Sequence, residues 1–404
     1  MTETSRLKLA LVTETFSPEV NGVAMTLGKL VEGLHQRGHR VEVVRPRQTG
    51  ETALASNDPQ PHILVKGIPI PTYNELRFGL PSKHRLIQCW RAKRPDIVHV
   101  ATEGPLGWSA VAAAHALGIP VSSSFHTNFH TYSQHYGIGW IKHLIERYLR
   151  TFHNRTLLTM VPTSAMLHDL HSRGFDNLAV LSRGVETRQF SPTRRSQTLR
   201  DHWGIGPDDL VCLHVGRLAK EKNIGAVLAA FHAIQAQQPR AKLVLVGDGP
   251  LRPSLAQAFP ECIFTGIQKG LALAEHYASS DVFLFPSLTE TFGNVVPEAL
   301  ASGLAVVAFA NGAAQELIIP HHNGLLAPLF AEPNFVNAAV AVASNSAKRQ
   351  QMRANAASSV AHLGWDAVCD SFAQTLSRLV LQHSGLAQQT ASAAPTLVIN
   401  QTSA

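Results

Sequence analysis

The sequence predicts an α/β protein with two successive parallel-sheet domains. Short, continuous apolar runs alternate with stretches of helical period, and the pattern restarts after a polar, proline-containing segment at 191–209. Such alternation is typical of βαβ units, in which helices cover both faces of a parallel sheet. The length of 404 residues also exceeds what one hydrophobic core usually organises.

The apolar runs give the positions of the expected strands and helices. We expect strands at 7–13, 41–44, 97–100, 121–125, 211–215, 243–246, 282–285 and 305–309, and helices at 23–35, at 106–117 and from about 223. Ligands bind beyond the carboxyl ends of strands in such sheets, so we expect a cleft where the two sheets face each other.

The same pattern divides the chain into four parts. We expect a first domain at 1–190, a second at 191–364, a C-terminal helix at 365–383 that crosses back to the first domain, and a disordered tail at 384–404. The hinge between the domains is expected near 185–200.

Composition excludes several classes of protein. Apolar residues make up 45% and charged residues 16%, which is unlike a disordered or coiled-coil chain. No run approaches the roughly 20 apolar residues of a membrane-spanning helix, so we expect a cytoplasmic protein. Four cysteines without a CxxC pair are expected to be buried free thiols rather than disulfide or zinc ligands.

The net charge of +7 is concentrated in the first half of the chain. Residues 1–185 contain 20 Lys and Arg against 13 Asp and Glu, whereas the remainder contains 15 of each. A basic half favours an anionic partner, and a solvated surface with chance clustering explains the charge equally well. We expect no nucleic acid partner.

The strongest motif follows the apolar strand at 282–285. A polar loop contains Glu290, and the next helix begins close to Gly293, Asn294 and Val295, whose backbone N–H groups can bind an anion. We place Glu298 two turns into that helix, from where its carboxylate reaches back to the same ligand. A solvated helix glutamate is the alternative, but the apolar flanking residues indicate packing, where a lone carboxylate is costly.

A second motif places cations after the strand at 211–215. Arg217 can bind two phosphate oxygens in a fork, and Lys222 adds a point charge. Together they can replace a divalent metal ion at a diphosphate, so we expect no metal. A surface turn with solvated cations is the alternative.

A third motif is the glycine-bearing loop at 13–24, where Gly22 lets the backbone approach a phosphate. The loop is not GxGxxG and no acidic residue is placed on the second strand for NAD, so an NAD-dependent dehydrogenase is a weak alternative.

Two further strand ends carry candidate groups. His126 could accept a hydrogen bond from a sugar hydroxyl or stabilise developing charge, although a structural role is commoner for one of 21 histidines. Backbone groups at Ile267 and Gln268 are placed to bind a base edge.

The segment 136–152 has the composition of an amphipathic helix. Aromatic and aliphatic residues recur at helical spacing, with Lys142, Arg147 and Arg150 between them. This pattern is typical of a helix in a lipid headgroup layer and equally of a helix that faces a protein core.

Taken together, in their order along the chain, these motifs resemble the retaining glycosyltransferases of the large family 4 group. Those enzymes have the GT-B fold, in which two Rossmann-like domains face each other across a cleft. The resemblance covers nearly the whole chain. It rests on Glu-Thr-Phe-Ser-Pro-Glu-Val-Asn-Gly-Val, Phe-His-Thr-Asn, Val-Pro-Thr-Ser-Ala, Gly-Arg-Leu-Ala-Lys-Glu-Lys-Asn, Val-Gly-Asp-Gly-Pro and the Glu-x7-Glu from Glu290 to Glu298.

The resemblance implies roles for most of these residues. Arg217 and Lys222 would bind the donor diphosphate, Gly22 would approach it, Glu290 would contact the transferred sugar, Glu298 the ribose, and His126 the sugar from the acceptor side. His126 and Glu290 would then be the catalytic residues. Since no motif residue stands as a covalent nucleophile, front-face substitution is the expected route.

The opening motif and Phe-His-Thr-Asn look closest to GDP-mannose-dependent α-mannosyltransferases and sulfoquinovosyl diacylglycerol synthases, which act on lipid or lipid-like acceptors. We therefore expect a metal-independent hexosyltransferase that moves mannose from GDP-mannose to a lipid or glycan acceptor, with the nucleotide sugar as co-substrate and no cofactor. We also expect contact with an anionic membrane surface, on its inner face. Transfer of a UDP-linked hexose (glucose, glucuronate or sulfoquinovose) to diacylglycerol, a GT-B-fold sugar-nucleotide epimerase and a nucleotide-sugar sensor stay open.

Overall fold

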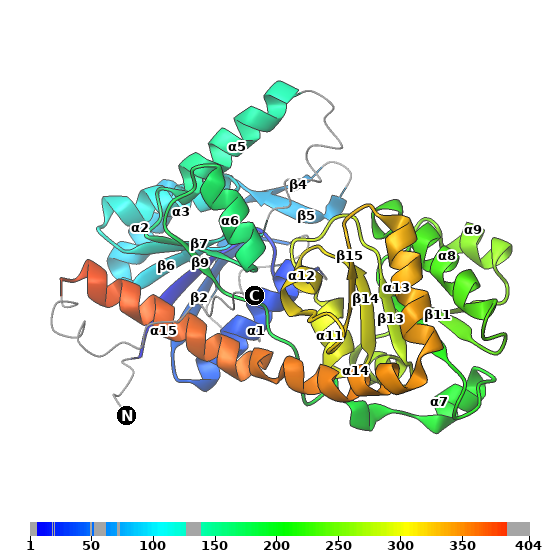
Figure 1. The fold of residues 1–404 in the computed structure, drawn as a ribbon. Coiled ribbons are helices and arrows are strands. Elements are labelled where there is room, and N and C mark those ends of the chain that lie inside the picture. The colour runs from blue at the N-terminus through cyan, green and yellow to red at the C-terminus, as the bar shows by residue number, and fades with distance from the viewer. Residues whose placement is uncertain are drawn as a thin grey trace. The chain divides into compact units, whose positions relative to one another are not determined.

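The computed structural model describes residues 6–17, 19, 21–48, 51, 62–70, 73–126 and 139–385, apart from the side chains at 70, 73–76 and 139–142. The chain divides into two compact units. The first comprises Met1–Ser124, Leu149–Met160 and Cys369–Ala404, and the second comprises Phe125–Tyr148 and Val161–Val368. The two parallel sheets drawn in Figure 1 confirm the predicted α/β class.

The first sheet has, within the described residues, seven strands in the order β3-β2-β1-β6-β7-β8-β9. They are β1 (Lys8–Val12), β2 (Arg40–Pro46), β3 (His62–Val65), β6 (Ile97–Val100), β7 (Val121–Ser124), β8 (Leu158–Val161) and β9 (Leu178–Val180). Neighbours from β3 to β8 pair in parallel. A separate antiparallel hairpin joins β4 (Gly67–Ile70) and β5 (Tyr73–Gly79).

Helices follow these strands as βαβ units require. They are α1 (Gly22–Gln36), α2 (Lys83–Ala92), α3 (Pro105–Ala116), α5 (Gly139–His153) and α6 (Ser164–Ser172). The side chain of Asn21 accepts hydrogen bonds from the backbone N–H groups of Val23 and Ala24, and this N-cap starts α1 at Gly22.

The second sheet has, among the described residues, six parallel strands in the order β12-β11-β10-β13-β14-β15. They are β10 (Val211–Val215), β11 (Lys242–Val246), β12 (Ile263–Gly266), β13 (Val282–Phe285), β14 (Ala305–Phe309) and β15 (Gly324–Ala327). The expected strands at 211–215, 282–285 and 305–309 are confirmed to the residue. Their near-continuous apolar sequence follows from burial on both faces.

Helices cover both faces of this sheet. They are α7 (Gln197–His202), α8 (Ile224–Gln235), α9 (Arg252–Ala258), α10 (Gly270–Ala278), α11 (Val295–Ala301), α12 (Ala313–Leu317), α13 (Glu332–Ser344) and α14 (Ser346–Ser359), with short 3₁₀ turns at Pro192–Arg194, Lys220–Lys222 and Ala361–Leu363. The last helix, α15 (Trp365–His383), follows them in the chain. Apolar residues of α10 and α11 form one core, and those of α8 and α13 form the other. Figure 1 shows α13 beside β13 and β14.

The start of α11 differs from the one expected from the sequence. Helix α11 begins at Val295, so Glu298 lies in its first turn and not two turns into it, because buried Phe292 and the turn at Gly293 precede the helix. Residues 386–404, which contain most of the expected disordered tail, lie outside the described residues. Cys212 and Cys262 are buried free thiols, as expected.

Helix α15 contributes to the first unit from Cys369 onward. It packs closely on α1, where a Cβ added at Gly33 would lie 2.3 Å from Cys369 Sγ. Arg37 Nε donates to Asp370 Oδ1 at 2.5 Å, and Phe372 meets the His99 ring edge to face.

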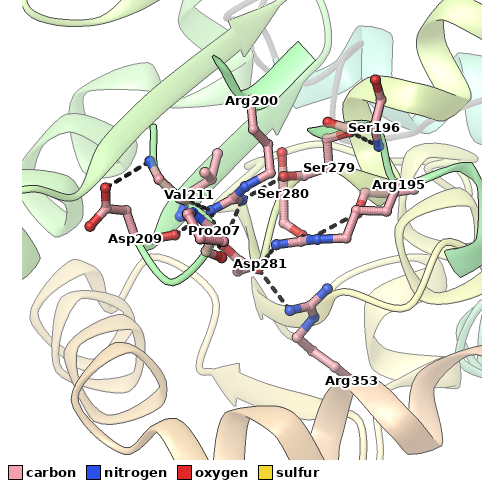
Figure 2. Close-up of polar contacts among 12 residues, drawn as sticks. Arg195, Ser196, Arg200, Pro207, Asp209, Val211, Ser279, Ser280, Asp281 and Arg353 are labelled. Carbon is pink, nitrogen blue, oxygen red and sulfur yellow. Dashed lines mark hydrogen bonds and ion pairs between the residues drawn. The ribbon is translucent and has the colours of Figure 1, made fainter. Parts of the chain in front are cut away.

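A cluster of arginines surrounds Asp281 at the amino end of β13 (Figure 2). Its carboxylate accepts hydrogen bonds from Arg353 at 2.7 Å, Arg195 at 3.2 Å, Arg200 at 3.4 Å and the Val211 N–H at 2.9 Å. The guanidinium of Arg200 is fully buried and also donates to main-chain carbonyls at 2.7 to 2.9 Å. Asp281 thereby joins β10 and β13 to the segment before β10 and to α14.

Replacing Asp281 by Asn should destabilise the fold strongly, because it leaves the buried guanidinium of Arg200 and the partly exposed ones of Arg195 and Arg353 without their carboxylate. We expect a loss of about 3 to 5 kcal/mol, seen as a lower urea midpoint. Asp370→Asn is the control, because Asp370 is 55% exposed and its partner Arg37 is 20% exposed; it should cost about 1 kcal/mol or less. Equal losses in the two variants would contradict a structural role for the cluster.

Candidate active site

The candidate site lies at the carboxyl ends of β10 and β13. These strands are neighbours in the second sheet, so the segments that follow them, 216–222 and 286–294, meet at one edge. The main-chain N–H of Leu288 donates to the carbonyl oxygen of Glu221 at 3.0 Å, which joins the two segments directly. Two of the motifs found in the sequence therefore form one site.

The central contact is an ion pair between Lys222 Nζ and Glu290 Oε1. The two side chains are 20% and 11% exposed, so the pair is largely shielded from water. Lys222 Nζ also lies 5.7 Å from the centroid of the Phe285 ring, a cation–π distance. The sequence indicated both residues but not that they bind each other.

Two glycines shape the loop that carries Glu290. Gly293 has φ +89°, and a Cβ there would meet the Glu290 carboxylate at 3.4 Å. Gly312, with φ +54°, lies so close that a Cβ would come within 2.5 Å of the Phe292 carbonyl oxygen and 3.0 Å of Glu290 Cβ. Both positions need glycine for conformation, and Gly312 needs it also for space.

The turn that opens α11 lies directly after Glu290. Gly293 and Asn294 use their carbonyl oxygens to accept from the N–H groups of Val296 and Glu298. Asn294 is already in the right-handed helical region, and Val295 is the first helical residue. The proposed backbone anion site at Gly293, Asn294 and Val295 thus lies beside the ion pair, on the same edge of the sheet.

Glu298 is held by a hydrogen bond from Tyr277. The Tyr277 hydroxyl, which α10 provides, donates to Glu298 Oε2 at 3.0 Å, and Tyr277 is fully buried. Burial raises the pKa of Glu298 to about 7 from an ordinary 4.5, and the Tyr277 hydrogen bond opposes that rise in part. Tyr277 could not be identified from the sequence, because a helix tyrosine among apolar residues is indistinguishable from a core residue.

The remaining expected residues lie on the same edge or outside it. Arg217 is 60% exposed, with Glu221 at 3.7 Å. Ile267 and Gln268 follow β12, two strands from β10, and Gln268 Nε2 donates to the Thr265 carbonyl at 3.0 Å. Gly22 belongs to the first unit, where it is the exposed first residue of α1.

His126 contacts a residue that the sequence analysis did not single out. Arg183 Nη2 lies 3.4 Å from His126 Nδ1, and Thr291 of the Glu290 loop donates to the His126 carbonyl oxygen at 3.4 Å. Arg183 is 8% exposed, and its guanidinium lies 5.8 Å from the centroid of the Phe292 ring. In the sequence, the signal that could have identified Arg183 was its position as a cation three residues beyond the end of β9.

Burial lowers the pKa of Arg183 to about 10, and the negative charge of Glu290 opposes that shift. The side chain is therefore still a cation at neutral pH, in contact with His126 and within electrostatic reach of Glu290, the two expected catalytic residues. Among the described residues, no group of three or more His, Cys, Asp and Glu side chains is arranged to hold a metal ion.

Comparison with known proteins gives consistent results for both halves of the chain. The model of Glycosyltransferase Family 4 matches residues 20–189, and that of Glycosyl transferases group 1 matches residues 209–345. The chain is 34% identical, over 369 residues, to the GDP-mannose-dependent alpha-mannosyltransferase of Mycobacterium tuberculosis (strain CDC 1551 / Oshkosh), covering 90% of this chain and 94% of that protein.

Two more distant comparisons agree with these. The chain is 33% identical to sulfoquinovosyl transferase SQD2 of Arabidopsis thaliana over 271 residues, 66% of this chain and 52% of that one. The sucrose-phosphate synthase structure from Thermosynechococcus elongatus superposes with a TM-score of 0.75 at 20% identity, over 93% of this chain and all of that one, which supports the GT-B fold. The chain belongs to the family 4 glycosyltransferases, GT-B enzymes that transfer a sugar from a nucleotide-linked donor.

Proposed function

We propose that this glycosyltransferase is a retaining, metal-independent hexosyltransferase that transfers mannose from GDP-mannose to a lipid or glycan acceptor. The observation that carries the proposal is the shielded pair of Lys222 and Glu290 beside Arg217, at the edge of the sheet where ligands bind in such folds. The choice of donor and acceptor is supported by the names of the relatives, one of which is a GDP-mannose-dependent alpha-mannosyltransferase.

In this proposal the cations hold the donor diphosphate. Arg217 is exposed and can form two parallel hydrogen bonds to phosphate oxygens, while Lys222 adds a nearby positive charge. The backbone N–H groups of Gly293, Asn294 and Val295 complete the diphosphate site in the second unit. No metal ion is needed, because the cations and N–H groups neutralise the leaving group.

Glu290 contacts the hydroxyls of the transferred sugar, and His126 contacts the same sugar from the acceptor side. The acceptor oxygen forms a bond to the anomeric carbon while the bond from that carbon to the diphosphate oxygen breaks on the same face. The leaving diphosphate oxygen keeps the bonding electron pair and takes the acceptor proton. Catalysis then rests on positioning and on stabilising the growing negative charge.

The nucleoside is assigned to the other end of the same edge. Glu298 accepts hydrogen bonds from the ribose hydroxyls, and backbone groups of Ile267 and Gln268 bind the base. A UDP-linked hexose (glucose, glucuronate or sulfoquinovose) transferred to diacylglycerol is the second candidate, supported by the 33% identity to a sulfoquinovosyl transferase. A sugar-nucleotide epimerase would share the diphosphate site but would need no acceptor.

A donor panel tests the proposal. The purified protein is ranked against GDP-mannose and the UDP-hexoses by thermal shift, and nucleotide release is then measured with and without a lipid acceptor, in the presence of EDTA. We expect GDP-mannose to give the largest shift, acceptor-dependent release, and no effect of EDTA. Acceptor-independent conversion of the sugar nucleotide would support the epimerase, and activity that needs added magnesium or manganese would contradict the cation site.

Replacing Glu290 by Gln should lower turnover by at least about a hundredfold with little change in nucleotide affinity. The variant keeps the shape but loses a charged contact to the sugar that strengthens in the transition state, while the diphosphate contacts remain. Turnover is measured by nucleotide release and affinity by titration with GDP. Glu261→Gln, the same change at a distant exposed position, is the control, and a variant at Glu290 with near-normal turnover would disprove its role.

Replacing Glu298 by Gln should change how stability depends on pH. The folded protein prefers protonated Glu298, so this stabilisation is complete below pH 4.5 and is lost as the pH rises through about 7. The urea midpoint of the parent should therefore fall relative to that of Glu298→Gln between pH 4.5 and 7 and level off above about pH 8. The contributions of other titrating groups, such as Glu14, are shared by the two proteins and cancel in the difference between their urea midpoints. A difference that stays constant with pH would show that the pKa of Glu298 is not raised.

The proposed membrane contact rests on α5. The apolar stripe of this helix has a buried part and an exposed part. Leu149 and Phe152 are buried in the protein, whereas Leu144 and Tyr148 are 53% and 43% exposed. Tyr136 of the expected stripe lies outside the described residues. Among the helices of the described residues, none has both the length and the apolar character needed to cross a membrane.

The protein should sediment with anionic vesicles at low salt and be released as salt increases, because exposed charges are screened beyond about 8 Å at physiological ionic strength. Reversing Arg147 and Arg150 to Glu should weaken the binding. Lys348→Glu, an exposed change on α14, is the control and should not. Equal recovery on neutral and anionic vesicles, or none on either, would remove the membrane contact and favour a water-soluble glycan acceptor.

A further inference from the structure

Arg183 is a buried cation to which neither the family comparison nor the sequence motifs assign a role. Its Nη2 lies 3.4 Å from His126 Nδ1. A guanidinium has five N–H donors and no acceptor, so in this contact Arg183 can only donate. His126 Nδ1 must therefore accept, which it can do only when it carries no proton.

A neutral imidazole has one N–H and one acceptor nitrogen. If Nδ1 accepts from Arg183, the proton of His126 lies on Nε2. The opposite tautomer would point an N–H of His126 at an N–H of Arg183, and the doubly protonated ring would add a repulsion between two cations.

We infer that Arg183 is a positioning residue that holds His126 in the tautomer with the proton on Nε2, so that His126 donates a hydrogen bond to a hydroxyl oxygen of the transferred sugar. The inference rests on the proposed function for the identity of the ligand, but the tautomer itself does not. This direction of the hydrogen bond is opposite to the one expected from the sequence, in which His126 accepts a hydrogen bond from a sugar hydroxyl.

Packing fixes both partners in place. The guanidinium of Arg183 lies 5.8 Å from the Phe292 ring centroid, and a Cβ added at the following residue, Gly184, would lie 2.5 Å from the indole of Trp365. On the other side, Thr291 donates to the main-chain carbonyl oxygen of His126 at 3.4 Å. Both segments therefore contact the loop that follows Glu290.

The contact also links His126 to the central ion pair. Thr291 and Phe292 directly follow Glu290, and the charge of Glu290 acts on Arg183. The negative charge of Glu290 thus interacts with two cations, Lys222 and Arg183. The same buried cation orients one candidate catalytic group and supports the negative charge of the second.

The tautomer can be measured directly by NMR. The full chain is labelled with ¹⁵N-histidine and studied at pH 8, where an ordinary imidazole is neutral, and the ring nitrogens of His126 are assigned by their disappearance in His126→Gln. We expect protonated Nε2 and unprotonated Nδ1 in the parent. A proton on Nδ1 in the parent would overturn the inference, whatever the variants do.

Two variants then separate donation from packing. Arg183→Met removes the donor and should populate the Nδ1–H tautomer, whereas Arg183→Lys keeps a cationic donor and should keep the proton on Nε2. An unchanged tautomer in Arg183→Met would also overturn the inference. Melting curves and the thermal shift with GDP check that each variant is folded.

Turnover supplies a second measurement that a purely structural role would not produce. We expect kcat of Arg183→Met to fall about ten- to a hundredfold with nearly unchanged KM for the donor, by analogy with losing one oriented donor, and to recover in Arg183→Lys. A parent without turnover on any nucleotide sugar would contradict the proposed function and leave the tautomer result standing. A fixed tautomer with normal kcat in Arg183→Met would contradict the inference alone.

Discussion

The ion pair between Lys222 and Glu290 is the interaction on which the candidate site depends. The two residues are 68 positions apart in the chain and meet because β10 and β13, which precede them, are neighbours in a parallel sheet. The contact is largely shielded from water, where a cation and a carboxylate are each costly alone. Gly293 and Gly312 shape the loop that brings Glu290 to it.

The same two strands are joined at their opposite end by Asp281. Its carboxylate accepts from the first N–H of β10 and from three arginines, so the alignment of β10 with β13 is fixed at the amino end. A displacement there would be transmitted along strands of only four and five residues to the loops that carry Lys222 and Glu290. The arginine cluster thus supports the site from the opposite end of these two strands.

Local sequence patterns located eight of the described strands and indicated the candidate residues. Continuous apolar runs located β10, β13 and β14 to the residue, because strands buried on both faces are almost entirely apolar, with buried His214 of β10 as the exception. The position of Glu298 was wrong by one turn, since Phe292 and Gly293, expected at the helix start, form the preceding turn.

Contacts between distant segments could not be predicted in the same way. The pairing of Lys222 with Glu290 depends on strand order, which one sequence does not reveal. Arg183 and Tyr277 are ordinary residues locally and acquire meaning only through His126 and Glu298, 57 and 21 positions away. The roles of the site residues in binding a donor stay predictions.

The most direct test of this account is a double-mutant cycle on the central pair. Lys222→Met, Glu290→Gln and the double variant are compared by kcat/KM with the best nucleotide sugar. If the two side chains act as one unit, the double variant should lose little more activity than the more damaged single variant, which means strong non-additivity. Losses that simply add in free energy would show that Lys222 and Glu290 act independently, and would contradict the account.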